Sequence, residues 1–290
     1  MKKYFSLTRL TRSVLAMGLL GVWLVGAPTV EANPPAPYNL IYGVVRDMYG
    51  TPLAAANVTV LLQTPAGVMI SGALVPGYAP GVNYRLKVPM DSGNTPTPYL
   101  PNALVAPAQF KLLVVINGVT NLPIEMKVSY ATLGQPGKTA RIDLTLGVDA
   151  NGDGIPDAWE FAFLATLGVD LPLASLNGNT VLTPDGLTLR QQYLFGTYPF
   201  NPDEPCVVNF MGIQNGVAVL QFPTITGRYY SVESSPDARH WNTASFLLPA
   251  DGANGTPRTF YYAPGIATAE VHLPAAANGA TARFFRLVVQ

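Results

Sequence analysis

The chain has 290 residues, of which 49% are hydrophobic and only 12% are charged, and its 17 Lys and Arg balance its 17 Asp and Glu. This balance leaves no basic surface of the kind that binds nucleic acid, so a nucleic-acid partner is not expected. The single cysteine, Cys206, cannot form an internal disulfide, which excludes a disulfide-built scaffold. We expect Cys206 to be a small buried thiol, with intermolecular pairing as the alternative, and the fold to depend on apolar cores.

Residues 1–32 have the pattern of a secretory signal peptide. Lys2 and Lys3 supply positive charge, an apolar run covers 14–25, and 30–32 (Val-Glu-Ala) form a small-residue cleavage site. The alternative is a membrane anchor, but the uninterrupted apolar run is shorter than the ~20 residues that a span needs. We therefore predict a secreted or cell-surface protein, with the periplasm as a further location, and no membrane span after removal of the signal.

The region 33–147 is predicted to be a β-sandwich. Its apolar residues fall in short runs rich in β-branched and aromatic side chains, and Gly, Pro or Asn bounds each run. The predicted strands are 40–46, 58–62, 84–88, 110–116 and 124–128. Short strands at this spacing, without long helical segments between them, favour a sandwich.

The first predicted hairpin carries a family resemblance. Residues 43–58 follow the pattern G-x-V-x-D-x-x-G-x-P-L-x-x-A-x-V. The matching residues are Gly43, Val45, Asp47, Gly50, Pro52, Leu53, Ala56 and Val58. This stretch resembles the opening of carboxypeptidase regulatory-like domains, which are immunoglobulin-like sandwiches. The resemblance covers this hairpin alone, and it implies an immunoglobulin-like fold with a non-catalytic accessory role.

Residues 149–160, DANGDGIPDAWE, match the D-x-[DN]-x-[DN]-G-x₅-E pattern of an EF-hand-like calcium loop. Ca²⁺ takes about 6–8 oxygen ligands, and a 12-residue loop supplies them from alternating positions, with a glycine at the sixth place for the sharp turn. The predicted ligands are the side chains of Asp149, Asn151, Asp153, Asp157 (directly or through water) and Glu160 (bidentate), and the backbone carbonyl of Ile155. The alternative is an acidic Gly/Asp turn that holds no ion.

The surroundings of this loop indicate a structural calcium site and not a sensor. Residues 140–146 alternate apolar and polar, which predicts a strand before the loop, whereas a sensor has a helix there. Residues 158–167 predict a short helix that ends at Gly168. Pro156, at the eighth place, has no N–H with which to pair a partner loop.

A second, degenerate copy of the loop covers residues 181–192. Asp185 keeps the fifth place and a glycine follows it, but Val181, Thr183 and Gln192 hold the first, third and twelfth places. One carboxylate remains where several are needed, so strong calcium binding is not expected at this copy.

The two predicted helices of this region are expected to pack against each other. The second covers 187–195 and ends at Gly196. The residues expected at the contact are Phe161, Leu164, Leu189 and Tyr193.

The region 206–290 is again strand-like. Its clearest runs are 216–222, 228–233, 259–262 and 283–289. Residues 227–241, with the closing Arg-Phe-Phe-Arg-Leu, resemble a β-sandwich module found at the C-terminal ends of large bacterial secreted proteins. In many of those, two segments of the types found here at 149–160 and 185–199 precede the module. This segment pair also resembles thrombospondin type 3 repeats and dockerins, and the module carries no assigned chemistry.

Neither of the two histidines is expected to be catalytic. His240 lies near Asp237 and Ser234, but the polar residues around it indicate a turn between strands. His272 and Glu270 are expected on the outer face of a strand, because apolar residues alternate with them. Zinc-ligand spacing, phosphate-binding loops and nucleophile elbows are absent from the sequence, so we expect a non-catalytic protein.

These features predict a mainly β chain with two β-sandwich domains, 33–147 and 206–290, joined by a short calcium-loop and helix-pair connector at 148–205. The expected function is that of a secreted, non-catalytic calcium-binding structural or interaction protein of the cell surface or matrix. Its partner would be a cell-envelope protein or a polysaccharide. The alternative is a carbohydrate-binding or accessory module of a polysaccharide-degrading system. The candidate sugar-stacking aromatics are Tyr78, Tyr84, Tyr99, Tyr229, Tyr230, Trp241, Tyr261 and Tyr262.

Overall fold

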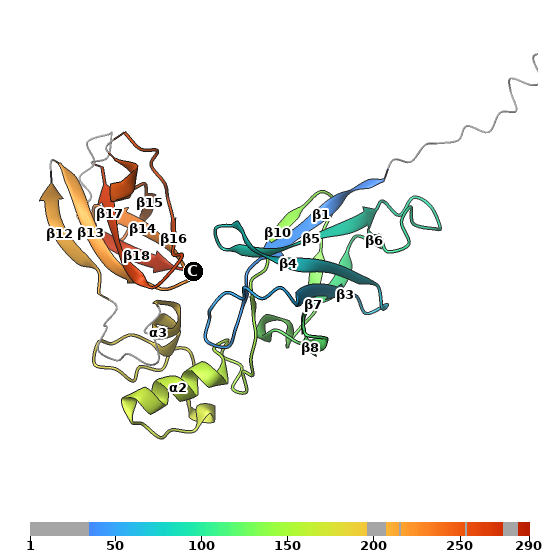
Figure 1. Cartoon of the computed structure of the whole chain (residues 1–290), viewed down its shortest axis with the longest axis horizontal. Helices are drawn as coiled ribbons and strands as arrows, with labels where there is room; N and C mark the ends of the chain where they lie inside the picture. The colour runs from blue at the N-terminus through green and yellow to red at the C-terminus, as the bar shows by residue number, and fades with distance from the viewer. Residues whose placement is uncertain (1–34, 196–206, 215, 253, 275–283) are drawn as a thin grey trace, which may run out of the picture. The chain divides into compact units, whose positions relative to one another are not determined.

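The structure is a computed structural model that describes residues 35–195, 207–214, 216–252, 254–274 and 284–290. Over these residues the protein is mainly β, with two α-helices placed between two sets of strands (Figure 1). The mainly β class predicted from the sequence is therefore confirmed. The predicted signal peptide, Cys206 and the boundary at 205–206 lie outside the described residues.

The first set of strands forms one sheet that folds over on itself and a small separate pair. The strands are β1 (Ala36–Gly43), β2 (Val45–Arg46), β3 (Val58–Gln63), β4 (Met69–Ala79), β5 (Val82–Asp91), β6 (Leu104–Val105), β7 (Ala108–Ile116), β8 (Val119–Asn121), β9 (Ala131–Leu133), β10 (Thr139–Arg141) and β11 (Leu144–Thr145). The order in the sheet is β10-β1-β5-β4-β3-β7-β8, with β6 on β5 and β9 on β7, while β2 and β11 pair in parallel.

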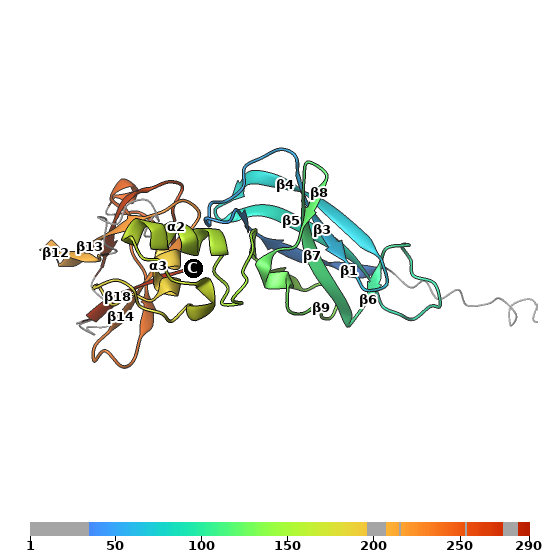
Figure 2. The ribbon, with the colours of Figure 1, turned by 90° about the horizontal axis from the view of Figure 1, so that it is seen from below.

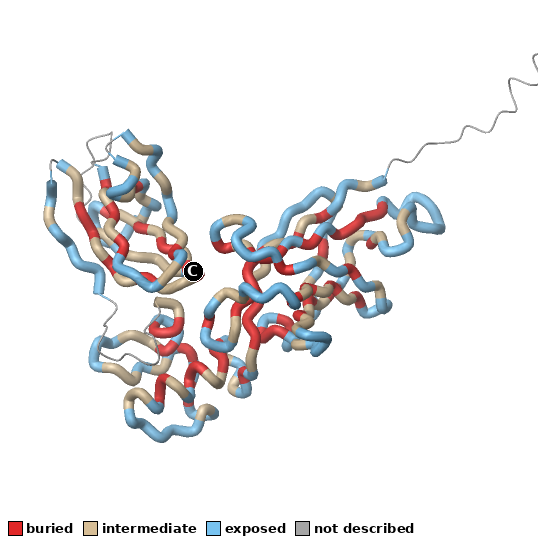
Figure 3. Tube along the Cα trace, in the orientation of Figure 1, coloured by how far each residue is buried: buried red, intermediate tan, exposed pale blue. Residues whose placement is uncertain are grey.

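The long strand β4 joins the two halves of the folded sheet. Residues 69–73 pair with β3, whereas Leu74 and Ala79 pair with β5, with a shift in register between these two residues. Side chains of β3 alternate between buried and half-buried, as expected for a strand with one face on a core. The inward residues of β3, β5 and β7 form one apolar cluster, drawn red in Figure 3. Its central members are Val60, Leu62, Leu86, Val88, Leu112 and Val114.

The prediction of a strand at 124–128 is wrong. Residues Ile124–Met126 form the short 3-10 helix η1, which follows Pro123. Ile124 and Met126 are buried, and the Glu125 carboxylate accepts a hydrogen bond from the backbone N–H of Thr145 (2.9 Å). The β-rich run that suggested a strand is here a single tight turn that buries Ile124 and Met126.

The helical connector contains α2 (Asp157–Leu167), the 3-10 helix η2 (Leu173–Ser175) and α3 (Leu189–Phe195). Helix α2 ends at Gly168, whose positive φ of 65° is the left-handed conformation that glycine adopts readily. Helix α3 begins after Thr188, which exchanges hydrogen bonds with Gln191 in the manner of a capping box. Both helices therefore start or stop close to where the sequence predicts.

The two helices lie side by side (Figure 2), and the contact residues differ in part from the prediction. Phe161 is exposed and contributes nothing to the interface, so its predicted role is wrong. Trp159 and Phe163 lie one helical turn apart and face inward, with ring centroids 5.0 Å apart. Trp159 also meets Tyr193 of α3 edge to face at 5.4 Å. Leu164, Leu189 and Tyr193 are buried as expected.

The second set of strands forms two sheets around another apolar cluster. The elements are β12 (Asn209–Gln214), β13 (Val217–Thr224), β14 (Tyr229–Ser235), β15 (Asn242–Ala244), the 3-10 helix η3 (Pro249–Asp251), β16 (Tyr261–Tyr262), β17 (Ala267–Leu273) and β18 (Phe284–Val289). One sheet has the order β12-β13-β17, and in the other β14 pairs with β15, β16 and β18. The cluster includes Leu220, Phe222, Tyr230, Val232, Phe246 and Val271. None of the helices in the described parts of the chain has the length and apolar character to cross a membrane.

Candidate metal centre

The first loop, residues 149–160, connects β11 to the first turns of α2, so the strand-loop-helix arrangement agrees with the sequence. The backbone N–H of Asp157 donates to the carbonyl of Val148 (2.7 Å), which brings the two ends of the loop together. Lys127, from the segment after η1, donates through Nζ to the carbonyl of Asp149 (2.6 Å). The loop is thus held to the preceding β region at its first residue.

Asp149 is the residue around which the loop turns. Its carboxylate accepts hydrogen bonds from the backbone N–H groups of Gly152 (2.7 Å), Asp153 (3.2 Å) and Gly154 (3.0 Å). The two glycines have φ of 74° and 82°, a conformation that other residues adopt only with strain. Asp149 is buried, so these donors replace the water that its charge would otherwise require.

After Asp149, side-chain oxygens at the third and fifth places of the loop each accept a hydrogen bond from the backbone N–H two residues further on. The side-chain oxygen of Asn151 accepts from the N–H of Asp153 (3.3 Å), and Asp153 Oδ1 accepts from the N–H of Ile155 (2.8 Å). The side chain of Ile155 is fully buried against α2 and α3 and fixes this part of the loop. Asp157, at the ninth place, accepts from the N–H of Ala150 (2.8 Å).

Glu160, at the twelfth place, has no exposed surface although it carries a carboxylate. Its oxygens lie 3.3 and 3.4 Å from the Asn151 amide nitrogen, which donates to them. Burial raises the pKa of Glu160 to about 7, and the negative charges of Asp153, Asp157 and Asp149 act in the same direction.

Asp153 shows the clearest unsatisfied group of the loop. Its Oδ2 atom is buried and has no hydrogen-bond partner. Burial raises the pKa of Asp153, and the neighbouring Asp149 and Asp157 add to this effect. A buried carboxylate oxygen without a donor is costly, and a cation would remove the cost. The residues present therefore fit a hard cation that prefers oxygen ligands.

The described residues contain no group of three or more His, Cys, Asp or Glu side chains in a metal-holding arrangement. Asp149 and Asp157 accept hydrogen bonds from backbone N–H groups, and two of the six expected ligands, Asn151 and Ile155, are not acidic. Calcium binding by the first loop stays a prediction.

Two basic residues that the sequence did not single out contact the backbone of the loop. Lys127 bonds the carbonyl of Asp149, and Arg190 of α3 donates through Nη2 to the carbonyl of Asp153. Both lie far from their acceptors in the sequence. The pattern of the loop carries no signal for them, because only the folded arrangement of η1 and α3 brings them near.

The region around His240 is a turn, as expected. The Asp237 carboxylate accepts from the N–H groups of Arg239 and His240 (both 2.9 Å) and from Ser235 Oγ (3.0 Å), and lies 2.7 Å from His240 Nδ1. The N–H of His240 is the main cause that lowers the pKa of Asp237. His240 is largely exposed, so this cluster closes a turn on the surface.

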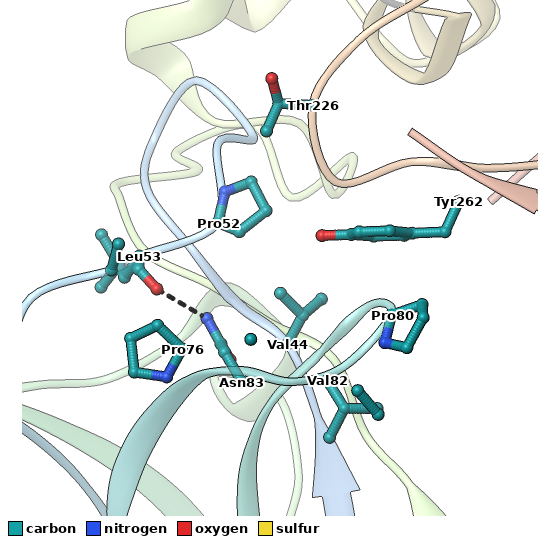
Figure 4. Close-up of a pocket in the computed structure, with 12 residues that line it drawn as sticks. Val44, Pro52, Leu53, Pro76, Pro80, Val82, Asn83, Thr226 and Tyr262 are labelled. Atoms are coloured by element: carbon teal, nitrogen blue, oxygen red, sulfur yellow. Dashed lines mark hydrogen bonds between the residues drawn. The ribbon is translucent and has the colours of Figure 1, made fainter. Parts of the chain in front are cut away.

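A cavity of about 410 Å³ lies among prolines, small residues and the ring of Tyr262 (Figure 4). The Asn83 amide points toward it, yet its nitrogen donates to the carbonyls of Val45 and Leu53 (both 3.0 Å) and its oxygen accepts from the N–H of Val45 (2.7 Å). Asn83 is therefore engaged in holding the chain around β2. The other residues that line the cavity are mainly apolar.

The candidate sugar-stacking aromatics differ in burial and orientation. Tyr84 and Tyr230 are buried in the two apolar clusters, so they cannot act as platforms. Tyr229 and Tyr262 are neighbours, but their ring planes are inclined by 53°. Tyr99 is well exposed on a loop of the first β region.

No protein-family model matches the chain, and no curated protein sequence matches it significantly. The resemblances noted for residues 43–58 and 227–241 therefore remain predictions.

Proposed function

We propose that this protein is a secreted, non-catalytic calcium-binding protein that acts by surface contact, with one Ca²⁺ stabilising the connector between its two β regions. The ion would be held by the side chains of Asp149, Asn151, Asp153, Asp157 and Glu160 and by the carbonyl of Ile155. The observation that carries the proposal is the poor satisfaction of two carboxylates in this loop. Glu160 is fully buried, and one oxygen of Asp153 has no hydrogen-bond partner.

Calcium would act through the stability of the folded loop. A ligand that binds the folded state alone stabilises it by about 2.7 kcal/mol at a hundredfold excess over Kd. Extracellular calcium modules have Kd of about 10⁻⁴–10⁻³ M, which suits a site outside the cell. Because a strand and not a helix leads into this loop, we propose a structural brace and not a calcium-driven switch.

The proposed place of action is the cell surface or the surrounding matrix, and the proposed partner is a cell-envelope protein or a polysaccharide. The location rests on the leader pattern of residues 1–32 and on the resemblance of residues 227–241 to modules of bacterial secreted proteins. The protein would then act by presenting the surfaces of its β regions to that partner.

Carbohydrate binding is the weaker candidate. It needs exposed aromatic rings in one plane, and the tilt between Tyr229 and Tyr262 works against it. Exposed Tyr99 is a single ring without a coplanar partner among the ring pairs of the described residues. A panel of polysaccharides assayed by affinity electrophoresis tests this candidate, and an unretarded chain would exclude it.

The calcium proposal predicts that Asp153→Ala abolishes the stability gained from calcium. Wild-type protein should melt roughly 5–10 °C higher in a hundredfold excess of Ca²⁺ than in chelator. The variant should melt at the same temperature in both, since it loses a ligand that carries negative charge. In chelator its stability should fall only modestly, because the change removes Oδ2, which has no partner, and Oδ1, which accepts one hydrogen bond, from the N–H of Ile155.

Asp170→Ala is the matched control. Asp170 is exposed and lies after α2, outside the loop, so this variant should keep the full calcium response. Equal melting temperatures for the wild type in calcium and in chelator would contradict the proposal.

A further inference from the structure

The second loop, residues 181–192, repeats the backbone arrangement of the first. Asp185 Oδ1 accepts from the N–H of Leu187 (3.0 Å), just as Asp153 Oδ1 accepts from the N–H of Ile155 (2.8 Å). The glycine at the sixth place has a positive φ in each loop, 82° in the first and 76° in the second. The turn of a calcium loop is thus formed twice, once with the full set of ligand residues and once without it.

The centre of the second loop is occupied by the side-chain amide of Gln192. This residue is buried, and its Nε2 donates to Thr183 Oγ1 (2.9 Å) and to Asp185 Oδ2 (3.0 Å). Thr183 Oγ1 in turn donates to Asp185 Oδ1 (2.5 Å). The third, fifth and twelfth places, which supply ligands in a calcium loop, are therefore joined through one NH₂ group.

We propose that the Gln192 amide takes the place of the cation in the second loop, so that this half of the connector folds without metal and supports the first half. An amide NH₂ group carries partial positive charge, and it attracts the oxygens of Thr183 and Asp185 as an ion would. The inference rests on the proposed function, since it treats the second loop as the metal-free counterpart of a calcium-binding first loop. It assigns one Ca²⁺ to each chain.

The metal-free half contacts the first loop directly. Arg190 of α3 donates through Nη2 to the carbonyl of Asp153, the fifth residue of the first loop. The backbone N–H of Arg190 donates to the carbonyl of Gly178 (3.0 Å), and the N–H of Leu189 donates to the carbonyl of Thr180 (2.8 Å). These bonds fix the start of α3 to the segment that precedes it. A loop that is already held in place loses less freedom when it binds an ion. The second loop thereby strengthens calcium binding by the first.

The test compares Gln192→Glu with Gln191→Glu, using melting curves of the full chain in chelator and in millimolar calcium chloride. Gln192→Glu removes the NH₂ donor and puts a buried carboxylate next to the exposed carboxylate of Asp185. It should melt several degrees below the wild type in chelator and regain more from calcium than the wild type does. Gln191 is exposed and its oxygen caps Thr188, a role that Glu also fills, so Gln191→Glu should behave as the wild type.

The two proposals fail in different ways. If the wild type melts identically with and without calcium, the proposed function is wrong. If the wild type responds to calcium but Gln192→Glu and Gln191→Glu melt alike in both conditions, the role assigned to Gln192 is overturned.

Hydrogen exchange of the wild type gives a test that needs no variant to fold. Removing calcium should raise exchange at Gly152, Asp153 and Gly154 and leave the protection of Leu187 and Leu189 unchanged. Equal loss of protection in the two loops would overturn the inference.

Discussion

The carboxylates of this chain differ in their hydrogen-bond donors, and these donors determine whether a carboxylate needs a cation to compensate its charge. Asp237 lies in an exposed turn and is surrounded by N–H and O–H donors. Asp153 and Glu160 are more deeply placed, with one oxygen of Asp153 lacking any donor and Glu160 bonded to a single amide. The Asp237 carboxylate is satisfied by donors within the protein. Asp153 and Glu160 have few donors, and we propose that a bound cation compensates their negative charge.

At the residue scale we predict that Asp237→Asn lowers stability at neutral pH. The folded-state pKa of Asp237 lies below its unfolded value, so its contribution is present above the unfolded pKa, about 4, and is lost as pH falls toward the folded pKa. The difference in melting temperature between variant and wild type should shrink as the pH falls below about 4. Asp170→Asn, the same change at an exposed residue outside the turn, should show no such dependence. A difference that stays constant with pH would contradict the account.

The 12-residue pattern predicted the sharp turn at Gly154, which has a positive φ of 82°. It did not predict the side-chain to backbone hydrogen bonds that shape the loop. The contacts of Lys127 and Arg190 could not be predicted, since they depend on how distant elements come together. Nor could the amide of Gln192 be predicted to bridge oxygens, because the sequence shows only the loss of a glutamate.

At the element scale, strands with regular alternation were predicted and β4 was not. Strands β3, β5 and β7 carry β-branched and aliphatic residues on their inner faces, which gives a clear signal. Strand β4 contains Gly72, Pro76 and Gly77, residues that usually mark turns. It is a strand because it crosses between two halves of the sheet and is paired on either side, a tertiary effect that local sequence does not express.

The inward face of α2 was predicted only in part, and a pair of variants tests the observed face. Trp159 is buried between Phe163 and Tyr193, so Trp159→Ala should destabilise the protein by about 3–5 kcal/mol. Phe161 is exposed on the opposite side, and Phe161→Ala should change stability by no more than about 0.5 kcal/mol. Urea unfolding of both variants measures these changes. A larger loss for Phe161→Ala than for Trp159→Ala would show that the helix faces the other way.

At the scale of the whole described chain, three apolar clusters follow one another, and the smallest belongs to the connector. The connector is bonded to the second β region at the end of α3. Arg228 donates through Nη2 to the carbonyl of Tyr193 (3.1 Å), and its guanidinium lies 4.8 Å from the centre of the Tyr193 ring. Since Tyr193 also meets Trp159 of α2, packing links the helix that follows the first loop to the residues that begin β14. A cation in the first loop would therefore stabilise more than the loop itself.

The most direct test of the calcium brace is a calorimetric titration of Ca²⁺ into the chelated chain, with a melting curve at each end point. The account predicts one site with Kd of about 10⁻⁴–10⁻³ M. It also predicts a melting temperature roughly 5–10 °C higher at a hundredfold excess. Far-UV circular dichroism at the two end points should agree, because the brace stabilises strands and helices that are already formed. An absence of binding heat together with an unchanged melting temperature would contradict the account and reduce the first loop to an acidic turn.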